Sequence, residues 1–353
     1  MKKRSLAIAL LIALLGPQTL KAAEAAPPPA DREIQVFYNY YPVEFPERKP
    51  VQDENNRVLV PVRAISEALD SKVTWDEEKK EVVITGTNPY TQSPIRLVFI
   101  EGRQDYYING ERFEMDTQAA IVDGSIMVPV RYVDQAFDST VKWSEAAKSV
   151  YMRVRDYKFD YSDGKQYYDY FDPAVFYDSP QETPVFDVVF PTYIPKTFNS
   201  DSPGYIAESI LQNVFLGYGR GYNRKQDVST SLPSSQLLIA GYIPELWDDH
   251  TQAADEYMNK FGYSCRYVDT DVNIYEVEDI DVTCRIQQCQ YVKISNEELS
   301  SVQYSIFCAS FMYQDILYRI RFSDFDEYDE AAYQEAVTES LKMIESMLKQ
   351  EVK

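Results

Sequence analysis

One segment of the chain occurs twice, and this repeat constrains the fold more than any other feature. Residues 57–84 and 125–152 align without gaps at an offset of 68. The identical pairs are Val60/Val128, Pro61/Pro129, Val62/Val130, Arg63/Arg131, Ala68/Ala136, Asp70/Asp138, Ser71/Ser139, Val73/Val141, Trp75/Trp143, Glu77/Glu145, Lys80/Lys148 and Val82/Val150. Most of these residues serve packing and turns, so the repeat predicts a duplicated folding unit.

The order of elements within each unit follows from its periodicity. Val58, Val60 and Val62 alternate as in a strand, and a proline precedes a short helical turn on which Val62, Ile65 and Leu69 recur at helical spacing. A polar turn and a second apolar run then predict a β-hairpin. Each unit therefore reads as strand, short helix and hairpin.

A further hairpin is expected ahead of each unit. In the second copy it turns at Asn109-Gly110, and in the first copy it is the less regular "IQVFYNYYPVEF". A single unit buries little apolar surface, so we expect the copies to stack their tryptophan-bearing faces into one core. The residues expected there are Val60, Pro61, Val62, Trp75, Val128, Pro129, Val130 and Trp143. For Arg63 and Arg131, we expect a salt bridge or carbonyl contact within each repeat.

The stretches "VLVPVRAISEALDSKVTWD" and "IMVPVRYVDQAFDSTVKWS" resemble the copper amine oxidase N-terminal-like domain, also called the stalk domain. The resemblance covers about residues 34–154 and implies an exported, non-catalytic appendage. Amine oxidase activity itself is excluded by two absences. Its copper site needs three histidines and the chain has one, and Asn39-Tyr40-Tyr41-Pro42 lacks the acidic residue and second tyrosine of the quinone-precursor motif. We expect no cofactor and no bound metal.

The N-terminus has the pattern of a secretory signal peptide. A basic stretch, an apolar run and small residues before Ala26 predict cleavage after residue 25, followed by a Pro/Ala-rich leader at 26–33. No cysteine follows the apolar run, so no lipid anchor is expected, and no transmembrane span is expected in the mature chain. Cleavage removes four basic residues and one acidic residue, which changes the net charge from −21 to −24. Such a charge argues against nucleic-acid binding.

The rest of the chain is predicted to be a linker and a second domain. Residues 34–155 form the first domain, with repeats at about 34–85 and 95–154, and residues 156–184 are a Tyr/Asp-rich linker. Residues 185–353 predict a separate α+β domain with an antiparallel sheet and flanking helices. The expected helices lie at about 203–214, after Pro244, and near the C-terminus, and "GYGRGYNR" at 217–224 is expected to be a flexible turn. "PTYIP" and "LYRIRF" resemble exported PsbP-like and MucB/LolA-like domains.

All four cysteines lie in this second domain, and an even number in an exported protein favours disulfides. Cys284 and Cys289 are an odd number of residues apart, so on one strand they would face opposite sides and bond to different partners. A turn centred near residue 298 would place Cys289 opposite Cys308. These steps predict Cys289–Cys308 and, by elimination, Cys265–Cys284; a structural zinc site is the rival interpretation.

Other candidate sites carry weaker patterns. His250 lies on the apolar face of an expected helix, as packed histidines commonly do. Asp269, Asp271 and Asn273 begin like a calcium loop, but Ile274 stands where glycine is needed and Ile280 where the bidentate glutamate is needed. Non-specific calcium binding by this acidic run is a further alternative.

The sequence therefore predicts an α+β, exported, non-catalytic binding or spacer protein of the cell surface, secreted or attached there. Its expected partners are a cell-wall polymer or another exported protein. One alternative is an exported hydrolase that uses a carboxylate pair such as Asp248/Asp249 or Glu276/Glu278. Another alternative is a small-ligand or lipid carrier, which would need an apolar cavity beside the second sheet.

Overall fold

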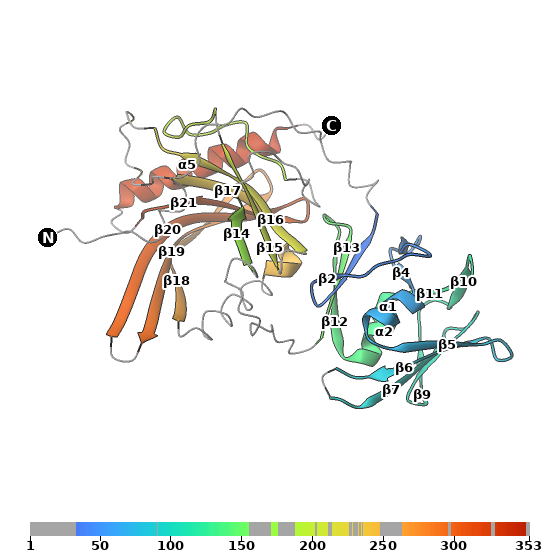
Figure 1. Cartoon of the computed structure of the whole chain (residues 1–353). Coiled ribbons are helices and arrows are strands. Elements are labelled where there is room, and N and C mark those ends of the chain that lie inside the picture. Colours follow the sequence, from blue (N-terminus) through green and yellow to red (C-terminus); the bar gives the residue numbers. More distant parts are fainter. Residues whose placement is uncertain are drawn as a thin grey trace.

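The computed structural model describes residues 33–154, 171–175 and 188–350, except 90, 202, 211–213, 226–227, 229–231, 233, 235, 248–262, 296–297 and 326–328. Residues 33–154 form several small sheets with two short helices, and the later residues form an eight-stranded sheet with one long helix (Figure 1). The protein is β-rich and of the α+β class. The predicted signal peptide and leader lie outside the described residues, except for Glu33.

Both repeat copies have the same order of elements. The first contains β4 (Val58–Pro61), α1 (Val62–Ala68), β5 (Lys72–Asp76) and β6 (Glu81–Thr87). The second contains β11 (Ser125–Pro129), α2 (Val130–Phe137), β12 (Ser139–Ser144) and β13 (Ser149–Val154). Each helix begins directly after a proline held in an extended conformation. Proline fixes φ near the helical value while its ring disfavours a helical residue before it, so it marks the strand-to-helix boundary.

Two of the identical pairs occupy turns that require left-handed backbone. Asp70 and Asp138 end the two helices at φ 50° and 52°. Lys80 and Lys148 close the two hairpins at φ 54° and 48°. Aspartate tolerates this region better than most residues because its short side chain bonds locally, which gives the retained aspartates a physical reason.

The two copies meet through their own equivalent strands. β4 and β11 pair antiparallel with Val60 directly opposite Val128, which are the same position of the repeat. β3 (Val51–Gln52) and β10 (Ala120–Val122) complete this four-stranded sheet at its edges. Pairing of equivalent residues across antiparallel strands is what a local two-fold relation between the copies produces.

Each copy's hairpin is extended by a strand that precedes the other copy. β6 pairs with β7 (Pro94–Ile100), followed by β8 (Asp105–Ile108) and β9 (Glu111–Glu114). The turn between β8 and β9 lies at Asn109-Gly110, as predicted, with φ 51° and 87°. β13 pairs in parallel with β1 (Gln35–Tyr38), which turns back into β2 (Tyr41–Pro42).

The core of the first domain contains most of the residues predicted for it. Val60, Val62, Val128 and Val130 are buried together with the apolar side chains of both helices. Pro61 and Pro129 are buried as well, and Trp143 packs half-buried against this core. Trp75 differs from the expectation, because its side chain lies at the surface with 37% of the residue exposed. The copies therefore join through β4, β11 and the helices, and not through stacked tryptophans.

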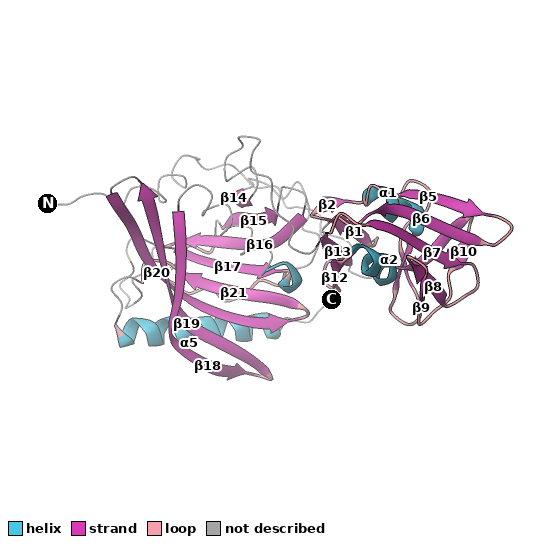
Figure 2. Cartoon of the chain, turned by 90° about the horizontal axis from the view of Figure 1, so that it is seen from below, coloured by secondary structure: helices cyan, strands magenta, loops and turns pink. Residues whose placement is uncertain are grey.

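The second domain is one antiparallel sheet in the order β14-β15-β16-β17-β21-β20-β19-β18 (Figure 2). Its strands are β14 (Phe171–Val175), β15 (Gly204–Ile210), β16 (Val214–Asn223), β17 (Gln236–Tyr242), β18 (Tyr263–Val277), β19 (Ile280–Ser295), β20 (Glu298–Tyr313) and β21 (Ile316–Phe322). β14 lies within the predicted linker. The helix predicted at about 203–214 is wrong, because Gly204–Ile210 form β15 and β16 begins at Val214.

The predicted flexible turn at 217–224 is also wrong, since Gly217, Gly219 and Gly221 lie within β16. A Cβ atom on Gly217 would lie 2.4 Å from the ring of Tyr242, and one on Gly219 would lie 2.7 Å from the Cβ of Ala240. Glycine at every second position therefore gives β16 one face without side chains, onto which β17 packs closely.

α5 (Glu330–Leu348) crosses one face of this sheet (Figures 1 and 2). It begins at Asp329, whose side chain accepts a 2.8 Å hydrogen bond from the Ala332 amide. Tyr333, Val337, Ile344 and Met347 are buried against the sheet, as the apolar stripe predicted. Residues 244–247 are helical, at the start of the helix predicted after Pro244. Among the helices of the described residues, none is both long and apolar enough to cross a membrane.

β1 and β13 lie between the two domains, and each domain covers one of their faces. Val36, Val150 and Met152 point into the core of the first domain, while Phe37 and Tyr151 belong to the core of the second domain. The rings of Phe37 and Tyr151 stack with centroids 5.4 Å apart. The two domains therefore share one continuous hydrophobic contact.

Candidate binding surfaces

Each repeat carries the same cluster of tryptophan, glutamate and lysine at its hairpin, more exposed in the first copy than in the second. The indole N–H donates to the glutamate over 2.6 Å in Trp75–Glu77 and 3.0 Å in Trp143–Glu145. Lys80 and Lys148 pair with these glutamates, and their Nζ atoms lie 5.9 and 6.0 Å from the indole centroids. These contacts explain why the three residue types occur together in both copies, since they fix the hairpin turn to the strand that carries the tryptophan.

Arg63 and Arg131 form the ion pairs predicted for them. Arg63 lies 3.7 Å from Glu47, with both side chains well exposed. Arg131 pairs with Asp116, and its guanidinium lies 5.1 Å from the ring of Tyr132. The hydrogen bond from Arg131 holds the pKa of the Asp116 carboxyl below its usual range. Both arginines are thus explained by structure within the first domain.

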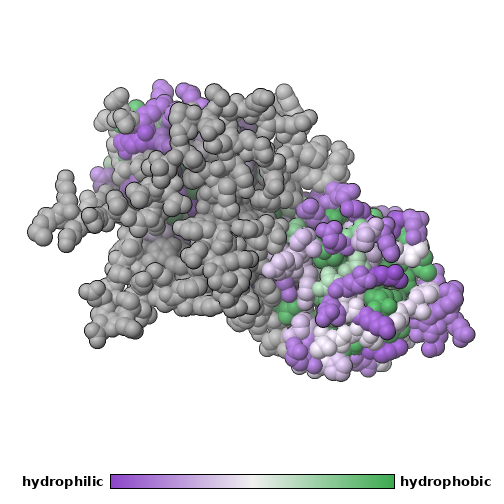
Figure 3. Space-filling view, viewed as in Figure 1, coloured by the Kyte–Doolittle hydropathy of each residue, from purple (hydrophilic) through white to green (hydrophobic). Residues whose placement is uncertain are grey.

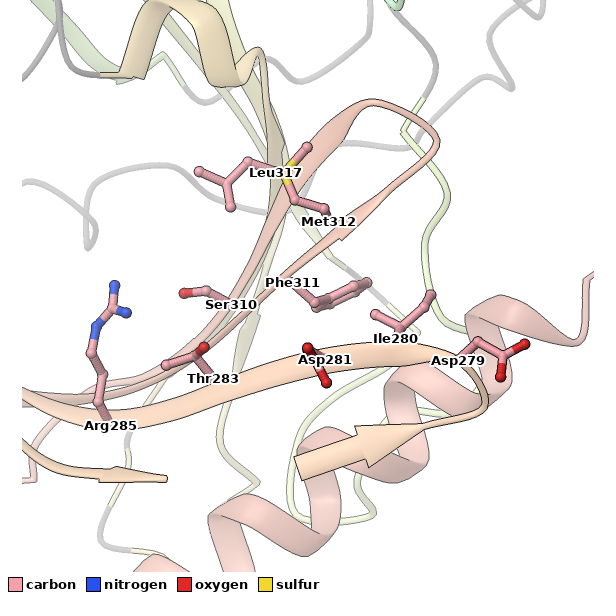
Figure 4. A pocket seen from close by; sticks show the side chains of 9 residues that line it. All are labelled: Asp279, Ile280, Asp281, Thr283, Arg285, Ser310, Phe311, Met312 and Leu317. Carbon is pink, nitrogen blue, oxygen red and sulfur yellow. The ribbon is translucent and has the colours of Figure 1, made fainter. Parts of the chain in front are cut away.

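The second domain presents a pocket of about 400 Å³ on its sheet. One wall comes from β19 and the turn before it, where Asp279, Asp281, Thr283 and Arg285 follow one another (Figure 4). The opposite wall comes from the β20–β21 hairpin. Its lining residues there are Ser310, Phe311, Met312 and Leu317, and Ile280 completes the floor. The lining thus combines four apolar side chains with three charged ones and two hydroxyls.

The acidic run that begins like a calcium loop is a strand. Asp269 lies 3.3 Å from the Arg285 guanidinium and accepts a hydrogen bond from Gln287. Asn273 donates to the Tyr333 hydroxyl over 2.9 Å, and that hydroxyl donates to the Asp271 carbonyl over 2.8 Å. The described part of the chain contains no group of three or more His, Cys, Asp or Glu side chains placed to hold a metal ion. Glu276 and Glu278, the alternative carboxylate pair, are both exposed.

The cysteine register differs from the predicted one. β19 and β20 pair Ser295 with Glu298, so Cys289 lies opposite Tyr304 and Cys308 lies opposite Arg285. Their turn is centred between residues 296 and 297, and this small displacement moves the partner of Cys289 by four residues. Cys284 and Cys308 are both buried free thiols. The predicted bonds Cys289–Cys308 and Cys265–Cys284 are therefore not formed.

The two described cysteines have different surroundings. Burial raises the pKa of Cys284 to about 12. Burial alone would also raise the pKa of Cys308, but Arg319 and Ser310 outweigh it and bring that pKa below its usual value. The Nε and Nη2 atoms of Arg319 both lie 3.3 Å from the Cys308 sulfur. Cys308 is fully buried, and this contact joins the neighbouring strands β20 and β21.

Polar groups also join the two domains. Lys142 of β12 donates a 2.7 Å hydrogen bond to the Glu245 carbonyl. Burial raises the pKa of the Glu245 carboxyl, and the charge of Asp315 adds to this effect. Other predicted candidates, His250 and Asp248/Asp249, lie outside the described residues.

The visible face of the first domain mixes polar side chains with smaller apolar patches (Figure 3). This domain, with its paired repeat strands and hairpins, is a small β-rich module. It precedes the larger α+β domain in the chain. Residues 37–152 match the family model of the copper amine oxidase N-terminal domain. No curated protein and no solved structure matches the chain.

Proposed function

We propose that this chain is an exported, non-catalytic binding or spacer protein of the cell surface. Its first domain is a stalk-type module that arose by duplication of one strand–helix–hairpin unit, and its second domain is held at a fixed position by that module. Support for the duplication comes from the pairing of Val60 with Val128 and from the repeated tryptophan–glutamate–lysine clusters. The family match to residues 37–152 supports the stalk-type role.

The observation that carries the spacer role is the shared hydrophobic contact between the domains. Tyr151 occupies the repeat position of Val83, and this larger ring packs into the core of the second domain. Val83 in the first copy is only half-buried. A module that buries aromatic rings in its neighbour transmits position and orientation, because separating the domains would expose those rings to water.

The charge of the chain favours a partner found outside the cell. The chain has a net charge of −21, which disfavours nucleic acid and anionic lipid and favours neutral or basic partners. A wall polymer or another exported protein meets this condition. The hydrolase alternative needs a pair of acid–base residues. Arg63 and Arg131 of the first domain already form ion pairs, and Glu276 and Glu278 of the second domain are exposed.

Co-sedimentation with purified bacterial cell walls tests this proposal. The sample is the mature chain, residues 26–353, at low and high salt, because an isolated first domain would expose Phe37 and Tyr151 and pellet through them. The Trp75→Ala variant removes an exposed ring, and Tyr41→Ala, which removes another exposed ring of the first domain, is the control. Salt-resistant pelleting that Trp75→Ala weakens would support wall binding by the first domain. Absence of pelleting would contradict it.

A further inference from the structure

β18 is the last strand in the order of the eight-stranded sheet, and no described strand pairs with its outer side. It is 15 residues long. An edge strand presents a row of backbone N–H and C=O groups that can pair with another extended chain. The first part of β18 ends in a bulge between Thr270 and Asn273, where Tyr333 bonds the Asp271 carbonyl. The bulge divides the edge into two regularly paired stretches, 263–270 and 273–277, and the second lies next to the surface described below.

The face of this stretch that points away from α5 is uncovered and carries exposed apolar side chains. Ile274 lies opposite Thr283, and 69% of its surface is exposed. Met312, on the same face two strands further in, is 47% exposed. Val282 and Cys284 alternate with Thr283 and are buried in the core under α5. Exposed apolar side chains grouped on one sheet face mark a surface that meets a partner.

Acidic side chains for which the described residues provide no ion pair lie beside these apolar residues. Glu276 is directly opposite Asp281 on the next strand, and like charges in this arrangement destabilise a strand pair. Asp279 and Asp281 also line the pocket, beside Met312 and Leu317 (Figure 4). The basic residue of the pocket, Arg285, is already paired with Asp269. A positive charge on an apolar stem would neutralise the carboxylates and cover Ile274.

From this arrangement we propose that the β18 edge, residues 273–277, binds an extended cationic segment of a partner protein by strand addition. Alternation along the added strand places basic side chains next to Ile274 and Glu276 and apolar side chains next to Tyr275 and Val277. Tyr275 and Val277 are half-buried against the core, so this apolar row extends the covered face of the sheet. The segment therefore alternates basic and apolar residues.

A second copy of this chain is a poorer occupant of the same edge. Pairing β18 with itself would bring Asp269, Asp271 and Glu276 of each copy close to those of the other, in a chain whose net charge is −21. The inference rests on the proposed binding function and gives the second domain its own partner. The co-sedimentation experiment tests wall binding by the first domain, so its failure would leave the strand-addition proposal for the second domain standing.

Titration of the full mature chain with a fluorescent heptapeptide of alternating lysine and valine tests the proposal by anisotropy at low salt. Glu276→Lys should weaken binding about tenfold, because one attraction is lost and one repulsion is added. Glu67→Lys, an exposed acid on α1, makes the same charge change elsewhere and should leave the affinity within about twofold. Glu276→Lys also creates an ion pair opposite Asp281, so this variant should fold at least as stably as the parent.

One peptide control separates strand addition from general attraction. The same heptapeptide with methylated backbone nitrogens keeps its charge but cannot donate ladder hydrogen bonds, and it should bind at least about tenfold more weakly. Equal binding of the methylated peptide would overturn strand addition. Equal effects of Glu276→Lys and Glu67→Lys would place the peptide elsewhere. Dimerisation in sedimentation velocity without peptide binding would assign the edge to a second copy and also overturn the proposal.

Discussion

Replacing Asp134 by asparagine should stabilise the protein at neutral and alkaline pH. Asp134 lies on α2 with 8% of its surface exposed, and its carboxylate accepts a hydrogen bond from the Ser139 hydroxyl. Burial raises the pKa of this carboxyl to about 6, although the Ser139 bond opposes the change, and the charge of Asp138 adds to it. The equivalent position of the first copy is Ser66, which is uncharged.

The magnitude and sign follow from proton linkage. The difference between a pKa of about 6 in the folded protein and the usual 3.8 corresponds to about 3 kcal/mol. Because the folded state holds the proton more tightly than the unfolded state, stability is greatest below about pH 4 and falls as the pH rises to about 6. Asparagine keeps the acceptor for Ser139 and has no charge to bury. Asp134→Asn should therefore be more stable than the parent by up to about 3 kcal/mol at pH 8, with little difference at pH 4.

Urea unfolding between pH 4 and pH 8, followed by tryptophan fluorescence, measures this difference. Two of the three tryptophans lie in the first domain, so the signal reports on the unit that contains Asp134. Asp70→Asn, which makes the same charge change at an exposed position just after α1, is the control. A gain for Asp134→Asn that persists at pH 4, or no gain at pH 8, would refute the burial argument.

Three further substitutions probe the domain contact and the second sheet. Tyr151→Ala should cost about 3–5 kcal/mol and split a single calorimetric transition into two, and an unsplit transition would argue against coupling through this ring. Gly217→Ala should lower the melting temperature through a cost of about 1–3 kcal/mol, because the new methyl group would overlap Tyr242; an unchanged melting temperature would mean that the ring moves aside. Glu245→Gln should gain stability over the parent as the pH rises above the ordinary glutamate range, since burial raises that pKa. Urea unfolding at pH 4 and pH 8 checks this, and equal curves at both values would contradict it.

The repeat units were readable from sequence because several local signals agree in them. Pro61 and Pro129 mark the strand-to-helix boundaries, and Asn109-Gly110 requires a left-handed turn. These preferences act within a few residues, so they do not depend on what packs against them. Trp75 was misplaced because the repeat pattern shows that a tryptophan is retained but not which side of it faces solvent.

The second domain was harder to predict because its decisive constraints are non-local. Ile206, Ile210 and Val214 are spaced by four, which places them on one face of a helix and equally on one face of a strand. The glycines at alternate positions of β16 were the available strand signal, and their meaning depends on Tyr242 and Ala240 in the next strand. The register of Cys289 depended on the exact centre of a hairpin turn, which composition alone does not specify. The edge position of β18 likewise depends on the order of all eight strands.

The parallel pairing of β1 with β13 has a mechanical consequence. β1 lies near the start of the described chain, and the chain leaves β13 toward the second domain. Tension applied between the N-terminus and the second domain therefore pulls these neighbouring strands past each other along their length. The four residue pairs that join them, Gln35/Ser149 to Tyr38/Met152, are loaded together in shear instead of being opened one at a time. Four pairs loaded together in shear resist extension more strongly than the same pairs opened one after another.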